Sequence, residues 1–139
     1  MYTVSKEIHF CYGHRLLNHT GKCRHLHGHN AKAVIRLEST TLDRLGMVCD
    51  FSEIGNYVKR WIDNELDHNM LMHKDDPILP TLLQAGERVY VMQENPTAEN
   101  IARLIFDYVA SGNFPVVEVI VHETASALAS YSRDSAGIS

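Results

Sequence analysis

Hydrophobic positions along the chain follow two different periods, and each period predicts one kind of secondary structure. Residues 2–10 and 31–38 alternate apolar with polar side chains, which is typical of strands that bury one face. Residues 116–121 form a largely β-branched run, and residues 127–132 suggest a last short strand. Residues 11–30, which hold three glycines and several histidines, are expected to form a long loop.

Two other segments repeat their apolar residues at helical spacing. Residues 52–66 carry an apolar side chain every three or four positions and follow Asp50, a residue type that favours helix starts. A second amphipathic helix is expected to begin at Asn95, or alternatively at Thr97, and to end near Gly112. We assign the apolar faces of both helices to the core.

The order of these elements predicts an α+β fold, in which a four-stranded antiparallel sheet carries two helices on one face. Residues 69–94 interrupt the order with a proline-containing loop, a helical turn at 80–84 and an extended piece at 89–92, and we assign them no role. No repeat or linker divides the chain, so a single domain over residues 1–139 is expected. Residues 133–139 are expected to fray.

Composition and charge narrow the possible partners. A net charge of −4 without any basic run argues against a nucleic-acid-binding protein. No apolar run is long enough to span a bilayer and the first residues show no signal-peptide pattern, so no membrane association is expected. Three widely spaced cysteines suit free thiols in a reducing compartment, and we therefore expect a cytoplasmic protein.

The candidate chemistry lies in a dense group of histidines. Five of the nine histidines fall within the sixteen residues 14–29. His27 and His29 point to the same face if their segment is extended, and Gly28 lets the backbone between them bend. His14 can approach from the preceding strand and supply a third nitrogen. Three neutral imidazoles with an open fourth position are typical of a catalytic zinc site.

The sequence leaves other interpretations of these residues open. Histidines can also cluster in a surface loop without binding metal. Cys23 could complete a closed structural zinc site, or it could be a thiolate beside the cation. His25 points away from His27 in an extended segment, so it is a surface residue, a neighbour of the ligands or a substrate contact. Asp67 and His68 could simply be solvated residues at a helix end.

Short motifs spread over the chain carry a resemblance to one family. Taken together and in this order, they resemble the 6-pyruvoyl-tetrahydropterin synthase / 6-carboxy-tetrahydropterin synthase family. The ordered set covers nearly the whole chain. The motifs are His14-Arg15-Leu16, Cys23-x-x-x-His27-Gly28-His29, Leu66-Asp67-His68, Asn95-Pro96-Thr97-Ala98-Glu99-Asn100 and His122-Glu123-Thr124.

The resemblance implies a fold and an assembly. The implied fold is the tunnelling fold, or T-fold, in which the sheets of several subunits join into an oligomeric barrel. The family typically forms a homohexamer, a dimer of trimers, with active sites at subunit interfaces. Such a barrel would pair the sheet edges that a single copy leaves exposed.

The resemblance also assigns roles to single residues. Zinc held by three histidines would act as a Lewis acid, and Cys23 would be the base that takes a proton from the substrate. His68, oriented by Asp67 and often supplied by a neighbouring subunit, would exchange protons with that thiol or act at a second carbon. Glu123 would anchor a pterin ring rather than form a cross-strand charge pair, and Thr97 is a further expected substrate contact. The zinc ligands would be His14, His27 and His29.

The implied substrate is 7,8-dihydroneopterin triphosphate. A 6-carboxy-tetrahydropterin synthase would be a zinc-dependent lyase that releases triphosphate and acetaldehyde on the route to queuosine. The short spacing from Cys23 to His27 matches that type. One alternative is a 6-pyruvoyl-tetrahydropterin synthase, which only eliminates triphosphate. Another is a zinc- and pterin-binding module without turnover.

Overall fold

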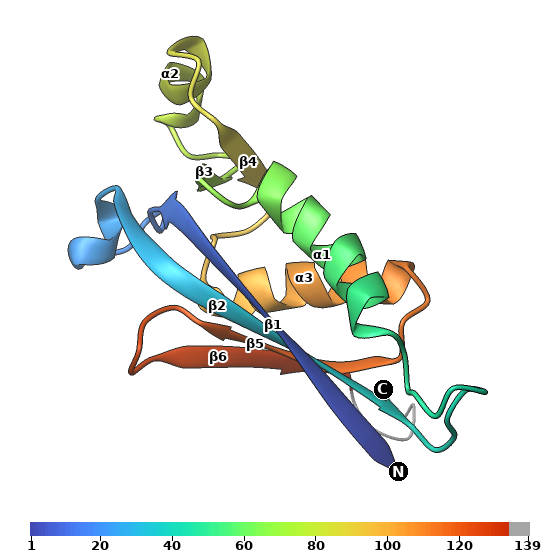
Figure 1. Cartoon of the computed structure of the whole chain (residues 1–139). Coiled ribbons are helices and arrows are strands. Elements are labelled where there is room, and N and C mark those ends of the chain that lie inside the picture. Colours follow the sequence, from blue (N-terminus) through green and yellow to red (C-terminus); the bar gives the residue numbers. More distant parts are fainter. Residues whose placement is uncertain (134–139) are drawn as a thin grey trace.

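The computed structural model describes residues 1–133, which form a six-stranded sheet packed against helices (Figure 1). Of residues 133–139, which were predicted to fray, 134–139 lie outside this described part. The strands are β1 (Tyr2–His14), β2 (His27–Ser39), β3 (Asn69–His73), β4 (Val89–Met92), β5 (Val116–His122) and β6 (Leu128–Ser132). The helices are α1 (Phe51–Glu65), α2 (Leu79–Gln84) and α3 (Ala98–Ser111), with a short 3₁₀ turn, η1, at Lys22–Arg24.

The sheet contains two strands beyond the four predicted, β3 and β4, and β4 coincides with the extended piece expected at residues 89–92. Its strand order is β4-β3-β1-β2-β5-β6. β1, β2, β5 and β6 pair antiparallel as expected, whereas β3 and β4 continue the sheet parallel to β1. The α+β class is therefore confirmed, but the four-strand count is wrong. β3 and β4 are too short to show a period of two, and they need the edge of β1 to form.

A long hairpin of β1 and β2 forms the centre of the sheet. Its register runs from the pair of Tyr2 with Ser39 to the pair of His14 with His27. The loop predicted over residues 11–30 is thus wrong at both ends, since only residues 15–26 connect the two strands. Polar histidines occupy inward positions at the loop end of the hairpin, and they hid the alternation there.

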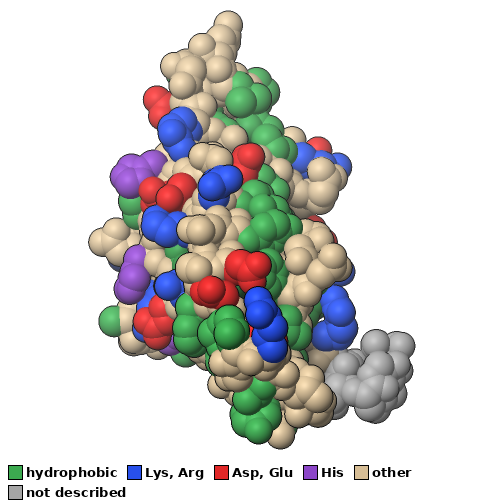
Figure 2. Space-filling model, turned by 45° about the vertical axis from the view of Figure 1, so that its right-hand side comes forward, with side chains coloured by type: hydrophobic (Ala, Val, Ile, Leu, Met, Phe, Trp, Pro, Cys, Tyr) green, Lys and Arg blue, Asp and Glu red, His purple; other side chains and the backbone are tan. Residues whose placement is uncertain are grey.

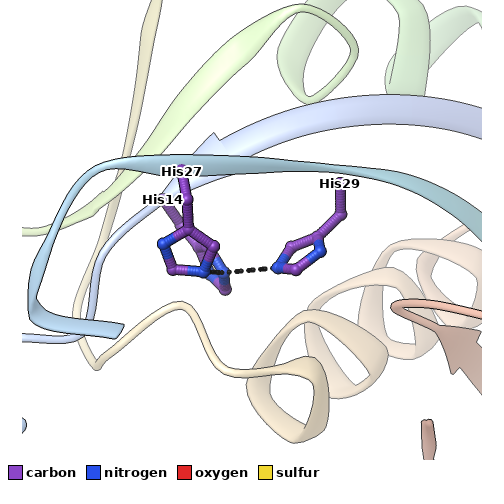
Figure 3. Close-up of side chains that lie close together, drawn as sticks. All are labelled: His14, His27 and His29. Carbon is purple, nitrogen blue, oxygen red and sulfur yellow. Dashed lines mark hydrogen bonds between the residues drawn. The ribbon is translucent and has the colours of Figure 1, made fainter. Parts of the chain in front are cut away.

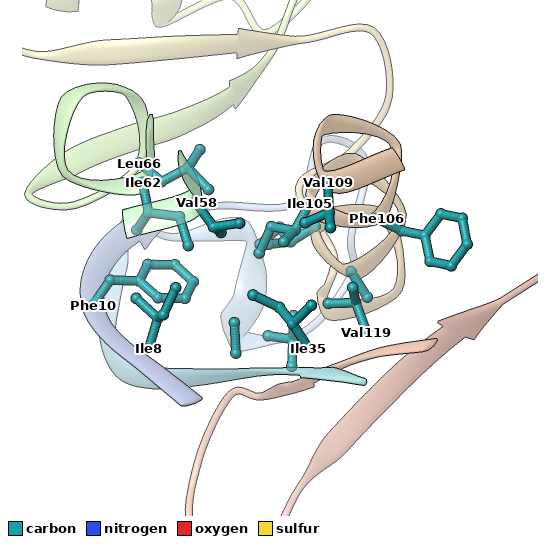
Figure 4. Packing of buried hydrophobic residues seen from close by; sticks show 14 of the residues in the cluster. Ile8, Phe10, Ile35, Val58, Ile62, Leu66, Ile105, Phe106, Val109 and Val119 are labelled. Atoms are coloured by element: carbon teal, nitrogen blue, oxygen red, sulfur yellow. The ribbon is translucent and has the colours of Figure 1, made fainter. Parts of the chain in front are cut away.

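The core lies between one face of the sheet and the two long helices (Figures 1 and 4). β1 contributes Ile8 and Phe10, and β2 contributes Ile35, all at most 4% exposed. Each such side chain stabilises the fold by about 1.5–3 kcal/mol through burial. The helical side of the core comprises Ile54, Val58, Ile62 and Leu66 near α1 and Ile101, Ile105, Phe106 and Val109 from α3.

Among the described residues, no helix has the length and apolar character needed to cross a membrane.

Side-chain caps fix where the two long helices begin. The Asp50 carboxylate accepts a hydrogen bond from the backbone N–H of Ser52 at the start of α1. Thr97 caps α3 by accepting from the N–H of Asn100, so the second of the two predicted helix starts is the right one. α3 ends at Gly112, as predicted.

Candidate functional site

Three histidine rings meet where β1 ends and β2 begins (Figure 3). His14 pairs directly with His27 across the hairpin, and His29 pairs with Tyr12. The Nε2 atom of His14 lies 3.1 Å from Nε2 of His27 and 3.2 Å from Nε2 of His29. The antiparallel register therefore brings all three expected metal ligands into one cluster, with their Nε2 atoms turned inward.

Hydrogen bonds on the outer side of two rings fix which nitrogen carries the proton. Nδ1 of His14 lies 2.7 Å from the carbonyl oxygen of Pro96, and Nδ1 of His27 lies 2.7 Å from that of His25. A carbonyl oxygen only accepts, so each Nδ1 is protonated and donates. In the neutral rings the two Nε2 atoms then face each other with lone pairs. Such lone pairs repel unless a cation lies between them, so the rings fit a metal ion.

The surroundings of His14 favour its neutral, ligating form. Only 2% of this residue is exposed. Burial lowers the pKa of His14, and the adjacent rings of His27 and His29 act in the same direction. The hydrogen bond to Pro96 and the charge of Glu123 oppose this change without reversing it. A proton shared between the rings is therefore disfavoured, and a metal ion is the better partner for the cluster.

A carboxylate stands beside the three rings. Glu123, which directly follows β5, has one oxygen 3.7 Å from Nε2 of His29 and the other 4.0 Å from Nε2 of His14. The buried Tyr12 hydroxyl donates a hydrogen bond to Glu123 over 3.3 Å. Burial and this carboxylate both raise the pKa of Tyr12, so the phenol keeps its proton. Sequence patterns gave no signal for this role of Tyr12, because an inward tyrosine on a strand reads as core.

One pocket gathers most of the residues expected to contact substrate. Cys23, Thr97 and Glu123 line this pocket of about 320 Å³, and His14 lines it as well. Cys23 belongs to η1, and its carbonyl oxygen accepts a hydrogen bond from the N–H of Leu16 over 2.8 Å. The pocket thus places a thiol, a hydroxyl and a carboxylate around one space that borders the histidine cluster.

A three-residue stretch before α3 connects the loop to the cluster. The Asn95 side chain accepts from the N–H of Leu17 over 2.8 Å and donates to its carbonyl over 3.0 Å. The next residue, Pro96, accepts the ring proton of His14, and Thr97 then caps α3. Asn95 does not cap the helix because both ends of its amide are bonded to the loop. Sequence reasoning missed these roles of Asn95 and Pro96, although the motif containing them was visible.

His68 lines a different pocket from Cys23, and Asp67 adjoins His68. They follow α1, and their neighbour is Cys11 on β1. The His68 N–H donates to the carbonyl of Cys11 over 2.7 Å, and the Cys11 N–H donates to the Asp67 carboxylate over 2.9 Å. His68 lines a pocket of about 670 Å³ together with His27 and His29, and Cys23 is not among the residues that line it. Within one chain, therefore, Asp67 and His68 do not line the pocket that contains Cys23, the expected base.

The remaining candidate, His25, contributes through its backbone. Its carbonyl receives the ring proton of His27, while its exposed side chain accepts a hydrogen bond from Arg24 over 3.2 Å. The site as a whole offers three imidazole donors, a carboxylate and, in the adjoining pocket, a thiol. That set can hold a divalent cation and move protons beside it.

Sequence comparisons connect this chain with named proteins. The model of the 6-pyruvoyl tetrahydropterin synthase family matches residues 3–134. A 6-carboxy-5,6,7,8-tetrahydropterin synthase from Rickettsia conorii is 37% identical over 131 residues, covering 89% of this chain and 95% of that protein. A protein of the same name from Aquifex aeolicus is 31% identical over 126 residues, covering 81% of this chain and 77% of that one.

Solved structures agree with the sequence comparison. An uncharacterized protein from Wolinella succinogenes superposes with a TM-score of 0.81 at 31% identity, covering 96% of this chain and 98% of that one. The 6-pyruvoyl tetrahydropterin synthase of Caenorhabditis elegans gives a TM-score of 0.72 at 21% identity, covering 96% of each chain, which is a likeness of fold. The predicted T-fold is thus confirmed for the chain. The family match over almost its whole length shows that this chain belongs to the 6-pyruvoyl tetrahydropterin synthase family.

Proposed function

We propose that this protein is a zinc-dependent lyase that converts 7,8-dihydroneopterin triphosphate to 6-carboxy-5,6,7,8-tetrahydropterin, with loss of triphosphate and acetaldehyde, on the route to queuosine. The observation that carries the proposal is the convergence of three imidazole nitrogens beside a pocket with a thiol and a carboxylate. Further support comes from relatives named for this activity that are 31–42% identical to the chain. The proposed unit is one domain over residues 1–139.

Zinc is the proposed ion, because three neutral imidazoles with an open position suit it. Bound there, it would supply a Lewis acid for oxygens of the substrate side chain. The chain itself orients the ring nitrogens toward one point. The carbonyl oxygens of Pro96 and His25 take the outer protons of His14 and His27, which turns both lone pairs inward.

Cys23 is proposed as the base that removes a proton from the substrate side chain. Its sulfur belongs to a pocket that also contains the carboxylate of Glu123. Lys22 and Arg24 flank it in sequence. Asn95 holds the loop that carries Cys23 through two hydrogen bonds to Leu17, so the loop presents the thiol in a fixed conformation.

Glu123 and Thr97 are proposed to bind the pterin ring. A carboxylate can accept two parallel hydrogen bonds from an amino-pyrimidinone edge. Tyr12 already donates to Glu123 and so limits the directions in which this carboxylate can turn. The Thr97 hydroxyl accepts from the N–H of Asn100, which leaves its own hydrogen free to donate to a ligand.

Asp67 and His68 are proposed to act together with the Cys23 of a second copy of the chain. The Asp67 carboxylate lies 2.8 Å from Nδ1 of His68 and orients the ring as its hydrogen-bond acceptor. The His68 side chain is 72% exposed and is therefore accessible to a neighbouring subunit. A proton could then pass between this ring and a thiol that the same chain does not supply.

A homohexamer, a dimer of trimers, is the proposed assembly. β4 and β6 are the two edges of the sheet, and they expose Val91 and Leu128. Hydrophobic side chains also form a band on the face shown in Figure 2, with charged side chains on both sides. Pairing of edges between copies would cover such surface. A cytoplasmic location is proposed because all three cysteines are unpaired.

Two other functions are kept as candidates. A 6-pyruvoyl-tetrahydropterin synthase is favoured by the description of the family model, which names that activity. A zinc- and pterin-binding module without turnover would need the histidine cluster and Glu123 but would have no use for a thiol beside them. The candidates differ in their products, so chemistry separates them.

Product identification by mass spectrometry tests the proposal. The zinc-loaded protein is incubated with 7,8-dihydroneopterin triphosphate, and the pterin, triphosphate and acetaldehyde are measured. We expect 6-carboxy-tetrahydropterin together with acetaldehyde. A pyruvoyl pterin without acetaldehyde would favour the first alternative, and binding without release of triphosphate would favour the second.

The Cys23→Ala variant tests the proposed base. We expect it to keep its metal and to lose turnover by about 10²–10⁴-fold, the usual contribution of a general base. Cys49→Ala is the matched control, since Cys49 packs against the core and does not line the pocket. Turnover at the wild-type rate in Cys23→Ala would remove this residue from the mechanism.

A further inference from the structure

A second group of metal-binding side chains lies outside the histidine cluster. Cys11, Asp67 and His68 bring a sulfur, a carboxylate oxygen and a ring nitrogen within 4.8 Å of one another. Cys11 is not part of any motif that carried the family resemblance, and the proposed reaction gives it no role. The three residues therefore form a separate cluster whose chemistry is unassigned.

The backbone holds this cluster in place from several sides. The N–H of His68 donates to the carbonyl of Cys11, and the N–H of Cys11 donates to the Asp67 carboxylate, so β1 and the turn after α1 are bonded in both directions. Arg88 donates to the carbonyl of Asp67 over 3.3 Å and to the side chain of Asn69 over 2.8 Å. His68 has a φ of 60°, in the left-handed region that few residues other than glycine adopt. Such a conformation persists where the surroundings fix the geometry.

The donor atoms lie close enough together for one divalent cation to bridge them once the His68 ring turns. The Cys11 sulfur lies 3.6 Å from both Nδ1 and Nε2 of His68, so it is not aimed at either nitrogen alone. Tetrahedral zinc with bonds of about 2.3 Å to sulfur and about 2.05 Å to nitrogen separates the sulfur from Nδ1 by about 3.6 Å, once the ring has turned Nδ1 toward the ion. The Asp67 oxygen lies 2.8 Å from the same nitrogen. That gap must widen by about 0.5 Å for a tetrahedral ion, and the exposed His68 ring is free to turn that far.

Charge and access also favour a cation here. The Asp67 carboxylate supplies a negative charge at neutral pH. Its oxygen Oδ1 accepts from Cys11, which leaves Oδ2 to face the ring. The cluster borders an open pocket of about 670 Å³, so an ion and a water ligand can reach it.

We infer that Cys11, Asp67 and His68 form a second binding site, for a thiophilic divalent cation such as Zn²⁺ or Co²⁺. On binding, the Cys11 thiol releases one proton to solvent, and the ring proton of His68 moves from Nδ1 to Nε2. The thiolate and the carboxylate then neutralise the two charges of the ion. Water completes the coordination on the exposed side.

Occupancy of this site has a consequence that rests on the proposed function. The ion replaces the proton between His68 and Asp67 and so breaks the hydrogen bond that orients the ring. A His68 ring held in this way cannot exchange protons with a thiol of another copy. Excess metal therefore inhibits the proposed reaction, while the first equivalent, at the histidine cluster, activates it.

Cobalt titration of the metal-free protein tests the site without any substrate. The histidine cluster contains no sulfur, so a sulfur-to-cobalt charge-transfer band in the near ultraviolet reports a cysteine ligand. We expect two cobalt ions per chain and this band in the wild type. The variant Cys11→Ser is expected to bind one ion without the band, and His68→Ala is expected to weaken the band-forming step by at least about 10-fold.

Cys23→Ser and Cys49→Ser are the matched controls, and both are expected to keep two ions and the band. If the band disappears in Cys23→Ser and persists in Cys11→Ser, the sulfur belongs to the histidine cluster and the inference is wrong. A wild-type protein with one ion and no band would overturn it as well. These spectra do not depend on turnover, so they separate failure of this site from failure of the proposed function.

Discussion

At the scale of single residues, two backbone carbonyls set the chemistry of the histidine cluster. Pro96 and His25 each accept a ring proton, and this leaves the Nε2 atoms of His14 and His27 without one. His29 completes the set from the next inward position of β2. The side chain of His25 takes no part, although it belongs to the same short stretch of sequence.

Removing one ring should therefore weaken metal binding far more than removing a neighbour. We expect His29→Ala to lower zinc affinity by more than about 100-fold, beyond the 10–100-fold loss typical of an outer contact. His25→Ala is the control, because it keeps the carbonyl that His27 uses, and its affinity should stay within about 3-fold of the wild type. Chelator competition measures both. Equal affinities in the two variants would contradict the assigned ligand set.

Tyr12 offers a second test at this scale. Its hydroxyl donates to Glu123 over 3.3 Å, so Tyr12→Phe leaves the carboxylate free to turn and removes one of its donors. We expect KM for the pterin substrate to rise about 5-fold, which corresponds to about 1 kcal/mol for one hydrogen bond, with zinc affinity unchanged. Tyr2→Phe, at an exposed strand start, serves as the control. An unchanged KM would show that Glu123 does not depend on Tyr12.

At the scale of elements, residues 69–94 brace the end of the hairpin that carries the histidine cluster. β3 pairs with the last residues of β1, and β4 pairs with β3. Asp76, in the turn before α2, is 2% exposed and accepts two hydrogen bonds from Arg15, the residue after His14. The segment that had no assigned role in the sequence thus anchors the strand end that carries His14.

Loss of this anchor should destabilise the fold in a pH-dependent way. Arg15 lowers the pKa of Asp76 by hydrogen bonding, with burial opposing it. Such a carboxylate stabilises the folded state above the unfolded pKa of about 3.9, and that contribution is lost as the pH falls through the lower folded pKa.

We expect Asp76→Asn to reduce the free energy of unfolding at pH 7 by about 2 kcal/mol, since it breaks a mostly buried pair. The difference from the wild type should shrink below about pH 4. Asp75→Asn, whose side chain is 66% exposed, should change stability by less than about 0.5 kcal/mol. Urea unfolding at several pH values measures all three proteins. A difference that stays constant down to pH 3 would contradict the assigned ion pair.

At the scale of the whole molecule, the chain separates two groups of residues that the proposed reaction needs together. Cys23 lines the pocket beside Thr97, whereas His68 lines the pocket beside Cys11. If each active site takes Cys23 from one copy and His68 from another, two inactive variants should complement each other.

We expect a mixture of Cys23→Ala and His68→Ala, unfolded and refolded together, to regain activity. With random assembly, about a quarter of the interfaces carry both intact residues, so about a quarter of the wild-type activity should return. The control is each variant refolded alone, which should stay inactive. A mixture as inactive as its components would place both residues in the site of one chain.

The sequence by itself determined the elements with strong periodicity and pointed to the three histidines that the structure brings into one cluster. The alternation of β2, the apolar stripes of α1 and α3 and the spacing of His27 and His29 depend on neighbours in sequence, so they can be read from it. Tertiary structure alone decided what depends on contacts between distant segments. It added β3 and β4 to the edge of β1, bonded Asn95 to the loop, and gave His68 the neighbour Cys11 in place of Cys23. The reason is physical: hydrogen bonds between segments far apart in sequence leave no periodic trace in either segment.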